Sequence, residues 1–404
     1  RKSPEYDPWP VFIVCKVLTQ YQEATGDERV IPVLLKFCRY MQDNLDSRPL
    51  ESWAKFRWAD FILIVHWLYE RTGEEWLLEL AEKVKSQGYD WRDHFVHFQH
   101  RRKQLTINME THVVNNAMGI KTPGVWYRQS GESEDREAVR LALENLDKFH
   151  GQVTGVFTGD EHLAGKNPSQ GTELCAVVEY MFSLEQLISI LGDSVLADRL
   201  EKIAFNALPA AFSPDMWAHQ YDQQVNQVIC NVAERDWTNG PDANIFGLEP
   251  NFGCCTANMH QGWPKFAASL WMKTPDNGLV AVAYGPSMVT ARVGETGQEV
   301  SIIEETEYPF DEILNFTIQS ARTVAFPLTF RIPSWAKGAT LTLPDGEILA
   351  LSAQSFQTIT REWQPGDRLR LTLPMEVETE RRYQGAVAVL RGPLVYSLKI
   401  GESW

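Results

Sequence analysis

Two adjacent cysteines, Cys254 and Cys255, are the sharpest chemical feature of the sequence, within Asn251-Phe-Gly-Cys-Cys-Thr256. In an extended segment, neighbouring side chains point to opposite faces, but a loop or a bulge can turn both thiols inward. Gly253 supplies the backbone freedom for such a turn. The pair could be two core thiols or a strained vicinal disulfide, and it could also offer two sulfur ligands to a metal ion.

A second motif, Gln170-Gly-Thr-Glu-Leu-Cys-Ala-Val-Val-Glu179, places a carboxylate two residues before another cysteine. Thr172 is predicted to cap a helix, with Glu173 in its first turn. Cys175 would then lie near the helix N-terminus, where a thiolate is stabilised. Glu173 and Cys175 could together offer one oxygen and one sulfur to the same metal ion.

Three sulfurs and one carboxylate make four ligands, a set that suits tetrahedral zinc. The usual Cys-x-x-Cys spacing of zinc sites is missing, so a metal site and a purely structural role both stay open. The remaining cysteines favour structural roles. Cys230 lies in the apolar segment 225–232, and Cys15 and Cys38 lie inside apolar helical runs.

A glycine-containing loop before the Glu173 motif, Phe157-Thr-Gly-Asp-Glu-His162, carries two adjacent carboxylates, Asp160 and Glu161. One of them could serve as a general acid/base, although a solvated loop carboxylate is the more frequent case. The short distance in sequence to the Glu173 motif favours the catalytic interpretation.

Further polar and aromatic residues are candidates for contacting hydroxyl groups and sugar rings. His112 lies in a polar loop that enters a helix. His219 precedes Tyr221 in a polar cluster that could contact hydroxyls or bond its own loop backbone. Trp58 and Tyr221 are predicted to line a pocket, because sugar rings present flat C–H faces to aromatic side chains; a core position would explain them equally well.

The elements that must position these residues are helices in the first two thirds of the chain. In segment 58–69, apolar residues at positions 58, 61, 62, 65 and 68 keep one helix face apolar. A helix stop at a glycine, an acidic cap and a further apolar helix recur at Gly26, Gly73 and Gly192. Repeated helical hairpins of this kind predict a solenoid or a closed toroid.

Around residue 273 the pattern changes to short β-rich runs separated by Gly, Pro and Asp. Evenly spaced short strands predict a sandwich or a barrel. We therefore expect a helical catalytic domain over residues 1–272 and a β-sandwich domain over residues 273–404. The predicted strands are 279–284, 298–303, 314–318, 328–332, 339–343, 368–373 and 386–390.

Length and charge narrow the classes of function. The 404 residues are too many for one compact core, which favours two domains. A formal net charge of −15 argues against nucleic-acid binding, and it disfavours a polyanionic substrate unless a local basic pocket overrides the overall field. No apolar run approaches the ~20 residues that span a bilayer, so no membrane association is expected. A homo-oligomer stays open.

Cysteine usage bears on the cellular compartment. Six cysteines in so long a chain do not make a disulfide scaffold, so a reducing compartment is expected. Because no signal-peptide pattern is visible, a cytoplasmic location is expected. The chain begins Arg1-Lys2-Ser3, without Met and without a signal-peptide pattern. We therefore expect a trimmed N-terminus.

The Glu-x-Cys motif followed by the Cys254-Cys255 pair resembles the β-L-arabinofuranosidase family, glycoside hydrolase family 127. Arg331-Ile-Pro-Ser-Trp335 and Gly392-Pro-Leu-Val-Tyr396 add weaker similarity, so the resemblance covers nearly the whole chain. It implies an (α/α)6 helical barrel joined to a β-sandwich, and a retaining exo-glycoside hydrolase that acts on β-L-arabinofuranosides or a related sugar.

The same resemblance implies roles for individual residues. Cys254, the first cysteine of the pair, would be the nucleophile, and Glu161 would be the acid/base. The double glycine usual before that glutamate is replaced here by Thr158-Gly159-Asp160, which makes Asp160 the alternative proton donor. The implied zinc ligands are Glu173, Cys175, Cys254 and Cys255.

Two other classes of protein compete with this expectation. Sugar epimerases and unsaturated-uronide hydrolases also use helical toroids, but they rely on His or Asp groups and need no cysteine cluster. A non-catalytic carbohydrate-binding protein with a structural zinc site is the third possibility, and such a site would be closed, with all its ligands buried.

Overall fold

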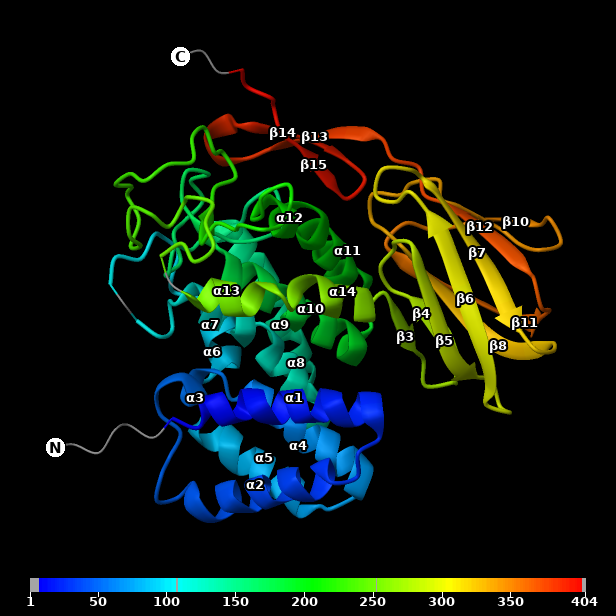
Figure 1. Cartoon of the computed structure of the whole chain (residues 1–404), viewed down its shortest axis with the longest axis horizontal. Coiled ribbons are helices and arrows are strands. Elements are labelled where there is room, and N and C mark those ends of the chain that lie inside the picture. The colour runs from blue at the N-terminus through cyan, green and yellow to red at the C-terminus, as the bar shows by residue number, and fades with distance from the viewer. Residues whose placement is uncertain (1–6, 107, 252, 402–404) are drawn as a thin grey trace.

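The computed structural model describes residues 7–106, 108–251 and 253–401 (Figure 1). The Arg1-Lys2-Ser3 start lies outside the described residues. Figure 1 shows the helices gathered on one side of the molecule and most strands on the other. The elements of the helical part are α1 (Trp9–Thr25), α2 (Val30–Asn44), α3 (Ser52–Phe56), α4 (Ala59–Thr72), α5 (Trp76–Gln87), α6 (Trp91–Val96), α7 (Val113–Gly119), α8 (Lys121–Ser130), α9 (Ser133–His150), β1 (Thr172–Glu173), α10 (Leu174–Leu191), α11 (Ser194–Lys202), η1 (Ile203–Ala207), α12 (Leu208–Ala210), β2 (Asp222–Gln223), α13 (Gly253–Met259) and α14 (Gly262–Ala268).

Helix ends follow the glycine pattern of the sequence. Gly26, Gly73 and Gly192 end α1, α4 and α10 at φ values of 70°, 69° and 62°. A residue with a Cβ atom is strained in this left-handed region, which explains why each stop is a glycine. Asp193 caps α11, because its side chain accepts the backbone N–H of Val195 at 3.0 Å. The three glycine stops and the acidic cap after Gly192 are confirmed. The acidic caps predicted after Gly26 and Gly73 are wrong, because α2 and α5 begin after Arg29 and Glu75, whose side chains do not cap them.

Helix α10 is the centre of the helical domain. It packs against α7, α8, α11, α13 and α14, and nearly all of its side chains are buried. Its 18 residues are long and apolar enough to cross a membrane, contrary to the expectation from the sequence, but 78% of this stretch is buried inside the protein. Burial on most sides explains why apolar residues surround this helix, with Glu179 and Glu185 as its buried carboxyl groups.

The strands form two packed sheets and a separate small sheet. The six-stranded sheet has the order β10-β9-β12-β7-β6-β5, and the four-stranded sheet has the order β11-β8-β4-β3, with β4 and β8 parallel. The strands are β3 (Trp271–Lys273), β4 (Leu279–Ala281), β5 (Ser287–Val293), β6 (Gln298–Thr306), β7 (Ile313–Ser320), β8 (Val324–Ile332), β9 (Thr340–Thr342), β10 (Ile348–Ala350), β11 (Ser355–Trp363), β12 (Arg368–Thr372), β13 (Val377–Arg381), β14 (Val387–Arg391) and β15 (Leu394–Tyr396).

The two larger sheets meet face to face as a sandwich. Val300 and Ile302 of β6 are buried, whereas the residues beside them are more exposed, which is the alternation expected of strands with one covered face. Phe316 of β7 and Phe330 of β8 come from opposite sheets, and their ring centroids lie 5.0 Å apart. The domain boundary placed after residue 272 falls within β3 and stays a prediction.

The small sheet, β13-β14-β15, returns to the helical domain. Figure 1 shows it above α11 and α12, outside the sandwich. Asn206 of η1 connects the two parts. Its side chain donates to the carbonyl of Pro393 at 2.8 Å and accepts the backbone N–H of Val395 at 2.7 Å.

A buried ion-pair cluster joins the sandwich to the helices. Arg331 of β8 is fully buried; it contacts Asp198 and lies 2.5 Å from Glu201 Oε2, both on α11. The backbone N–H of Ser334 donates to Asp198 at 2.9 Å. The Arg331-Ile-Pro-Ser-Trp335 motif therefore anchors one domain to the other.

Replacing this arginine tests the anchor. Arg331→Met is expected to lower the free energy of unfolding by about 3–5 kcal/mol, because Asp198 and Glu201 would lose the cation that balances them in a buried setting. Urea denaturation followed by circular dichroism measures the change. Arg361→Met, which removes an exposed pair with Asp345 at 3.0 Å, is the control, with a loss below about 1 kcal/mol. Equal losses for the two variants would contradict the anchor.

Candidate functional site

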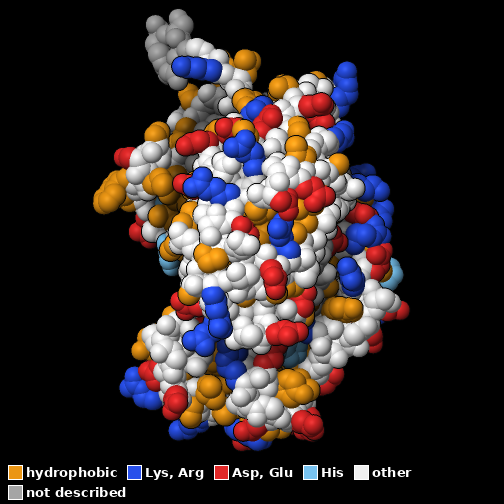
Figure 2. Space-filling view, turned by 90° about the vertical axis from the view of Figure 1, so that its right-hand side faces the viewer, with side chains coloured by type: hydrophobic (Ala, Val, Ile, Leu, Met, Phe, Trp, Pro, Cys, Tyr) orange, Lys and Arg blue, Asp and Glu red, His pale blue; other side chains and the backbone are white. Residues whose placement is uncertain are grey.

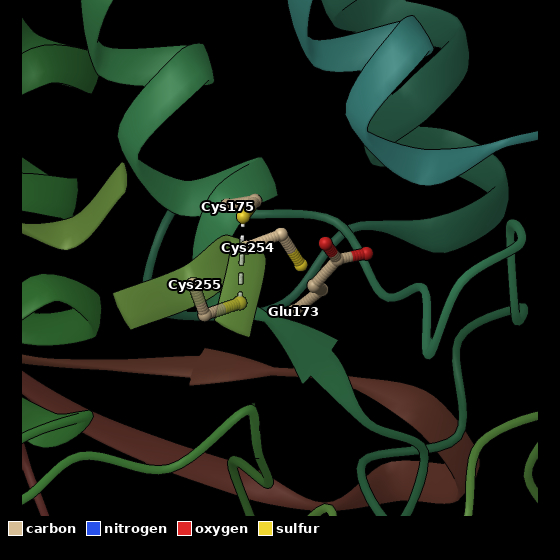
Figure 3. A group of neighbouring side chains, drawn as sticks. All are labelled: Glu173, Cys175, Cys254 and Cys255. Carbon is tan, nitrogen blue, oxygen red and sulfur yellow. Dashed lines mark hydrogen bonds between the residues drawn. The ribbon is translucent and has the colours of Figure 1, made fainter. Parts of the chain in front are cut away.

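Four side chains from two short segments of the chain, about 80 residues apart, meet at one point (Figure 3). Cys175 Sγ lies 3.4 Å from Cys255 Sγ, and Cys254 and Glu173 complete the group. Each residue offers one ligand atom, and these atoms all lie within 4.8 Å of one another. The structure thus brings together the four residues proposed as metal ligands, and we call them the cysteine cluster.

The adjacent cysteines lie in the first turn of α13 and not in an extended segment or a loop. Successive side chains on a helix are rotated by about 100°, so one thiol can face the interior while the next faces a cavity. Cys255 is fully buried beside Cys175, whereas Cys254 is exposed. Both members of the pair are free thiols, which excludes the vicinal disulfide. Phe252 of the motif lies outside the described residues.

The start of α10 positions the other two members of the cysteine cluster. Thr172 and Glu173 form β1, which pairs with β2 at Gln223 and Asp222. Glu173 directly precedes the helix, and its own side chain does not cap it; the Thr172 hydroxyl has no hydrogen-bond partner among the described residues. The predicted helix cap at Thr172 is therefore wrong, because strand pairing holds that residue in an extended conformation. Cys175 lies in the first turn of α10, as expected.

The electrostatics of the cysteine cluster favour a bound cation. Glu173 is 2% exposed, and its Oε2 has no hydrogen-bond partner among the described residues. Burial, followed by the charges of Glu161 and Cys254, raises the pKa of Glu173. Hydrogen bonds from Cys175 and Cys255 hold the pKa of the Cys254 thiol well below its usual range. An orphaned buried carboxylate oxygen beside a thiolate is a donor set that suits zinc.

Glu161 faces the cysteine cluster from a tight turn. Its φ is 115°, a strained value for a residue other than glycine, and such strain concentrates at functional sites. A Cβ atom at Gly159 would lie 2.3 Å from Val113, so only glycine fits there. Tyr221 Oη donates to Glu161 Oε1 at 2.5 Å and lies 3.5 Å from Cys254 Sγ. The tyrosine hydroxyl therefore bridges the carboxylate and the thiol.

Asp160, the alternative proton donor, is held by the protein interior. It is 1% exposed, and it accepts the backbone N–H of Thr238 at 2.9 Å and the Thr238 hydroxyl at 3.2 Å. Burial raises the pKa of Asp160. These bonds fix the loop around residue 238 to the turn that carries Glu161, which is a structural role.

His112 lies on the other side of Glu161. Its Nδ1 accepts the backbone N–H of Asn115 at 3.2 Å and caps α7, so the ring proton is assigned to Nε2. This Nε2 lies 3.5 Å from Glu161 Oε2. The imidazole packs edge to face on Trp53, with ring centroids 5.3 Å apart. His112 is thus placed beside the carboxylate, within the same cavity.

The cavity that these residues share has a volume of 760 Å³, within the range of small-ligand sites. One wall carries the candidate chemistry and consists of His112, Glu161, Glu173, Cys175, Tyr221 and Cys254. The other lining residues that matter here lie in or directly beside α1, α3 and α14. Sequence reasoning missed these residues, because no local pattern marks them: Trp9, Lys16, Trp53, Arg57, Gln261 and Lys265.

Two residues predicted to bind substrate lie outside this cavity. Trp58 is 4% exposed, its indole N–H donates to the carbonyl of Tyr89 at 3.0 Å, and it borders a separate cavity. His219 is 1% exposed, and its Nε2 lies 2.9 Å from Thr256 Oγ1. Trp58 therefore belongs to the packing of the helices, and His219 supports the helix that carries the cysteine pair.

Comparison with known proteins adds a family match. The family model described as beta-L-arabinofuranosidase, GH127 catalytic domain, matches residues 9–268, and the GH127 middle domain of the same family matches residues 278–375. A curated relative from Bifidobacterium longum subsp. longum is named non-reducing end beta-L-arabinofuranosidase. It is 25% identical over 431 residues, which cover 93% of this chain and 62% of the relative. The chain thus spans less than two thirds of that relative.

Solved structures share the fold. A structure described as a glycoside hydrolase is 19% identical and has a TM-score of 0.76. The match covers 96% of this chain and 69% of that chain. A GH127 beta-L-arabinofuranosidase from Geobacillus stearothermophilus T6, at 22% identity, has a TM-score of 0.72, with 95% of this chain and 65% of that chain covered. These likenesses confirm the expected (α/α)6 barrel followed by a β-sandwich.

Proposed function

The chain belongs to the β-L-arabinofuranosidase family, glycoside hydrolase family 127, and from that premise we propose that it is a retaining exo-glycoside hydrolase. Cys254 would be the nucleophile, bound to zinc at rest, and Glu161 would be the acid/base. The substrates would be β-L-arabinofuranosides or glycosides of a related sugar, since the curated relative is named for that activity.

The exposure of one thiol in the cysteine cluster carries this proposal. Cys175 and Cys255 are buried, whereas Cys254 is exposed and lines the cavity. A structural zinc site is closed, with all its ligands buried, while a catalytic site opens onto a pocket. This asymmetry favours an enzyme over a binding protein with a structural metal site.

In the first step, the Cys254 thiolate would attack the anomeric carbon while Glu161 gives its proton to the leaving oxygen. The carbon–oxygen bond to the leaving group breaks, and a carbon–sulfur bond to Sγ forms. Tyr221 links the two groups through contacts of 2.5 and 3.5 Å. Because both groups contact one hydroxyl, Glu161 Oε1 and Cys254 Sγ lie closer together than the ~6.5–9.5 Å between the two carboxyl groups of inverting enzymes, which favours retention.

In the second step, ionised Glu161 would accept a proton from water as the water oxygen attacks the same carbon. Cys254 then leaves as a thiolate, and two inversions at one carbon give net retention. His112 Nε2, 3.5 Å from Glu161 Oε2, would stabilise the ionised carboxylate between the two steps.

Zinc fits the residues that the cysteine cluster supplies. Two thiolates on one zinc ion lie at most about 4.6 Å apart, because each Zn–S bond is ~2.3 Å long. The 3.4 Å separation of Cys175 and Cys255 meets this limit. Held by Glu173 and three sulfurs, zinc would keep Cys254 deprotonated at neutral pH and fixed in position.

The zinc site is testable without activity. We expect one zinc ion per chain, and we expect Glu173→Gln to weaken zinc binding at least about 100-fold, because even outer partners of metal ligands contribute 10–100-fold. Competition with a chromophoric chelator measures the affinity. Cys38→Ala, which removes a buried thiol outside the cysteine cluster, should leave it unchanged. Unaltered affinity in Glu173→Gln would contradict the proposed ligand set.

A panel of aryl furanosides and pyranosides, assayed with zinc quantified on the same sample, tests the activity. We expect hydrolysis of β-L-arabinofuranosides or of a related glycoside, with the anomeric configuration retained in the first product detected by NMR. Epimerisation without hydrolysis, action confined to unsaturated uronides, or binding without turnover would each contradict the proposal.

A further inference from the structure

One wall of the cavity gathers positive charge. Lys16 of α1 and Lys265 of α14 line it, and their Nζ atoms lie 3.4 and 4.2 Å from the centroid of the Phe182 ring. Arg57 adds a third cation, and its guanidinium packs on the Trp53 ring at 4.3 Å. We call Lys16, Arg57 and Lys265 the basic wall.

The basic wall has few anions to balance it. Among the described residues, its three cations form no ion pair within 4.0 Å. The carboxylate that these cations share is Glu179. Burial alone would raise the pKa of Glu179, but the positive charges around it outweigh that effect and lower the pKa; they come from Lys16, Lys121, Lys265 and Arg57. Gln261 donates to Glu179 Oε1 at 3.2 Å, while the buried Oε2 has no hydrogen-bond partner among the described residues.

The neighbouring charged groups do not supply the missing anion. Lys121 and Asp60 are both buried and form their own ion pair at 3.0 Å. Burial raises the pKa of Glu185 to about 8, so this carboxyl group is largely neutral at pH 7. Burial and the neighbouring charge of Lys16 lower the pKa of Lys265 to about 7, so this lysine is partly protonated at pH 7 and a bound anion would favour its charged form. Glu179 therefore stands against Lys16, Arg57 and a partly charged Lys265.

The basic wall contrasts with the acidic balance of the whole chain. The formal net charge is −15, and Figure 2 shows Lys and Arg side chains interspersed with Asp and Glu over the face it presents. Lysines that only aid solubility extend into water, whereas Lys16 and Lys265 are half-buried in a cavity. Partly desolvated ammonium groups bind an anion more strongly than exposed ones do, because the local dielectric is lower.

We propose that the basic wall is a subsite for a carboxylate on the leaving part of the glycoside, such as an acidic sugar. This inference rests on the proposed hydrolase function and specifies its substrate class. The sugar to be released would lie against Cys254 and Glu161. The carboxylate would accept charge-assisted hydrogen bonds from Lys16 and Lys265, and Glu179 Oε2 would accept one from a hydroxyl beside it.

A matched pair of ligands tests the subsite. The compound 3-(carboxymethyl)phenyl β-L-arabinofuranoside and its methyl ester differ in charge, while the methylene group keeps their reactivity at the glycosidic bond similar. Their sulfur-linked analogues resist hydrolysis, so dissociation constants can be measured by calorimetry on the full, zinc-loaded chain. The acid is expected to bind at least about tenfold more tightly than the ester.

Substitution of either lysine should remove most of this preference. Lys16→Met and Lys265→Met are each expected to lower the acid/ester affinity ratio at least about fivefold and to change ester binding less than about twofold. Lys36→Met, an exposed lysine on α2, is the control and should leave the ratio unchanged. A rise in ionic strength should also lower the ratio.

Three outcomes would overturn the subsite: no binding of the acid, equal binding of acid and ester by the unmodified protein, or equal losses for both ligands in the lysine variants. The hydrolase proposal is judged separately, by turnover of the oxygen-linked ester. If the ester were not hydrolysed, the hydrolase proposal would fail, and the dissociation constants would still show whether the basic wall binds the carboxylate.

Discussion

Cys254→Ser is expected to lower kcat at least about 10³-fold while the protein stays folded. A serine hydroxyl is protonated at neutral pH and is a far weaker nucleophile than a thiolate, so the attacking group would be lost. The thiol of Cys254 is exposed to the cavity, and its replacement leaves the packed core unchanged. Saturation kinetics on an activated aryl β-L-arabinofuranoside measure kcat, and near-ultraviolet circular dichroism reports the fold.

Cys230→Ser is the matched control. Cys230 is a half-buried free thiol outside the cysteine cluster, and its side chain donates to the carbonyl of Asn244 at 2.8 Å. A serine hydroxyl can make the same bond, so activity within about threefold of the unmodified protein is expected. If Cys254→Ser kept more than about a tenth of its activity, the nucleophile role would be refuted.

Glu161→Gln is expected to act most strongly on substrates with poor leaving groups. For alkyl β-L-arabinofuranosides, kcat/KM should fall about 10²–10⁴-fold, the usual contribution of a general acid. A nitrophenolate leaves without protonation, so the first step on nitrophenyl glycosides should suffer much less. The dependence of kcat/KM on the pKa of the leaving group, compared between the variant and the unmodified protein, measures this difference.

Asp160→Asn separates the two carboxylates of this turn. Because Asp160 bonds to Thr238, its loss should disturb the loop and lower activity on both substrate classes alike. A dependence on the leaving group that appears in Asp160→Asn and not in Glu161→Gln would transfer the proton-donor role to Asp160.

Much of the fold could be predicted because local patterns reflect local requirements. The glycines that end the helices mark positions with a left-handed backbone conformation, which glycine adopts without strain. The apolar runs 298–303 and 328–332 lie within β6 and β8. Strands β5 and β11 were not predicted. Each keeps one face exposed, so polar residues alternate along it and its composition resembles that of a loop.

The candidate site also has one part that could be predicted from the sequence and one part that could not. The cysteine cluster could be proposed from the sequence, because three thiols and one carboxylate make a tetrahedral zinc set. The motif spacing alone left a structural role open, and the family resemblance decided for the metal site. The basic wall could not, since Lys16, Arg57 and Lys265 come from separate elements, and a lysine on an amphipathic helix resembles any solvated residue. For Trp58 the sequence left a pocket position and a core position open. The spacing of apolar residues in segment 58–69 favours the core, and the structure buries Trp58 there.

A covalent bond between the sugar and Sγ of Cys254 is the step that distinguishes this mechanism from the alternatives. Rapid quenching of the zinc-loaded protein during turnover of an activated aryl β-L-arabinofuranoside, followed by proteolysis and fragmentation mass spectrometry, detects that bond directly. We predict a pentosyl adduct on Cys254 and none on Cys175 or Cys255, with more adduct in Glu161→Gln, which lacks the base for the second step. An adduct on a carboxylate, or an inverted product without any cysteine adduct, would contradict the mechanism.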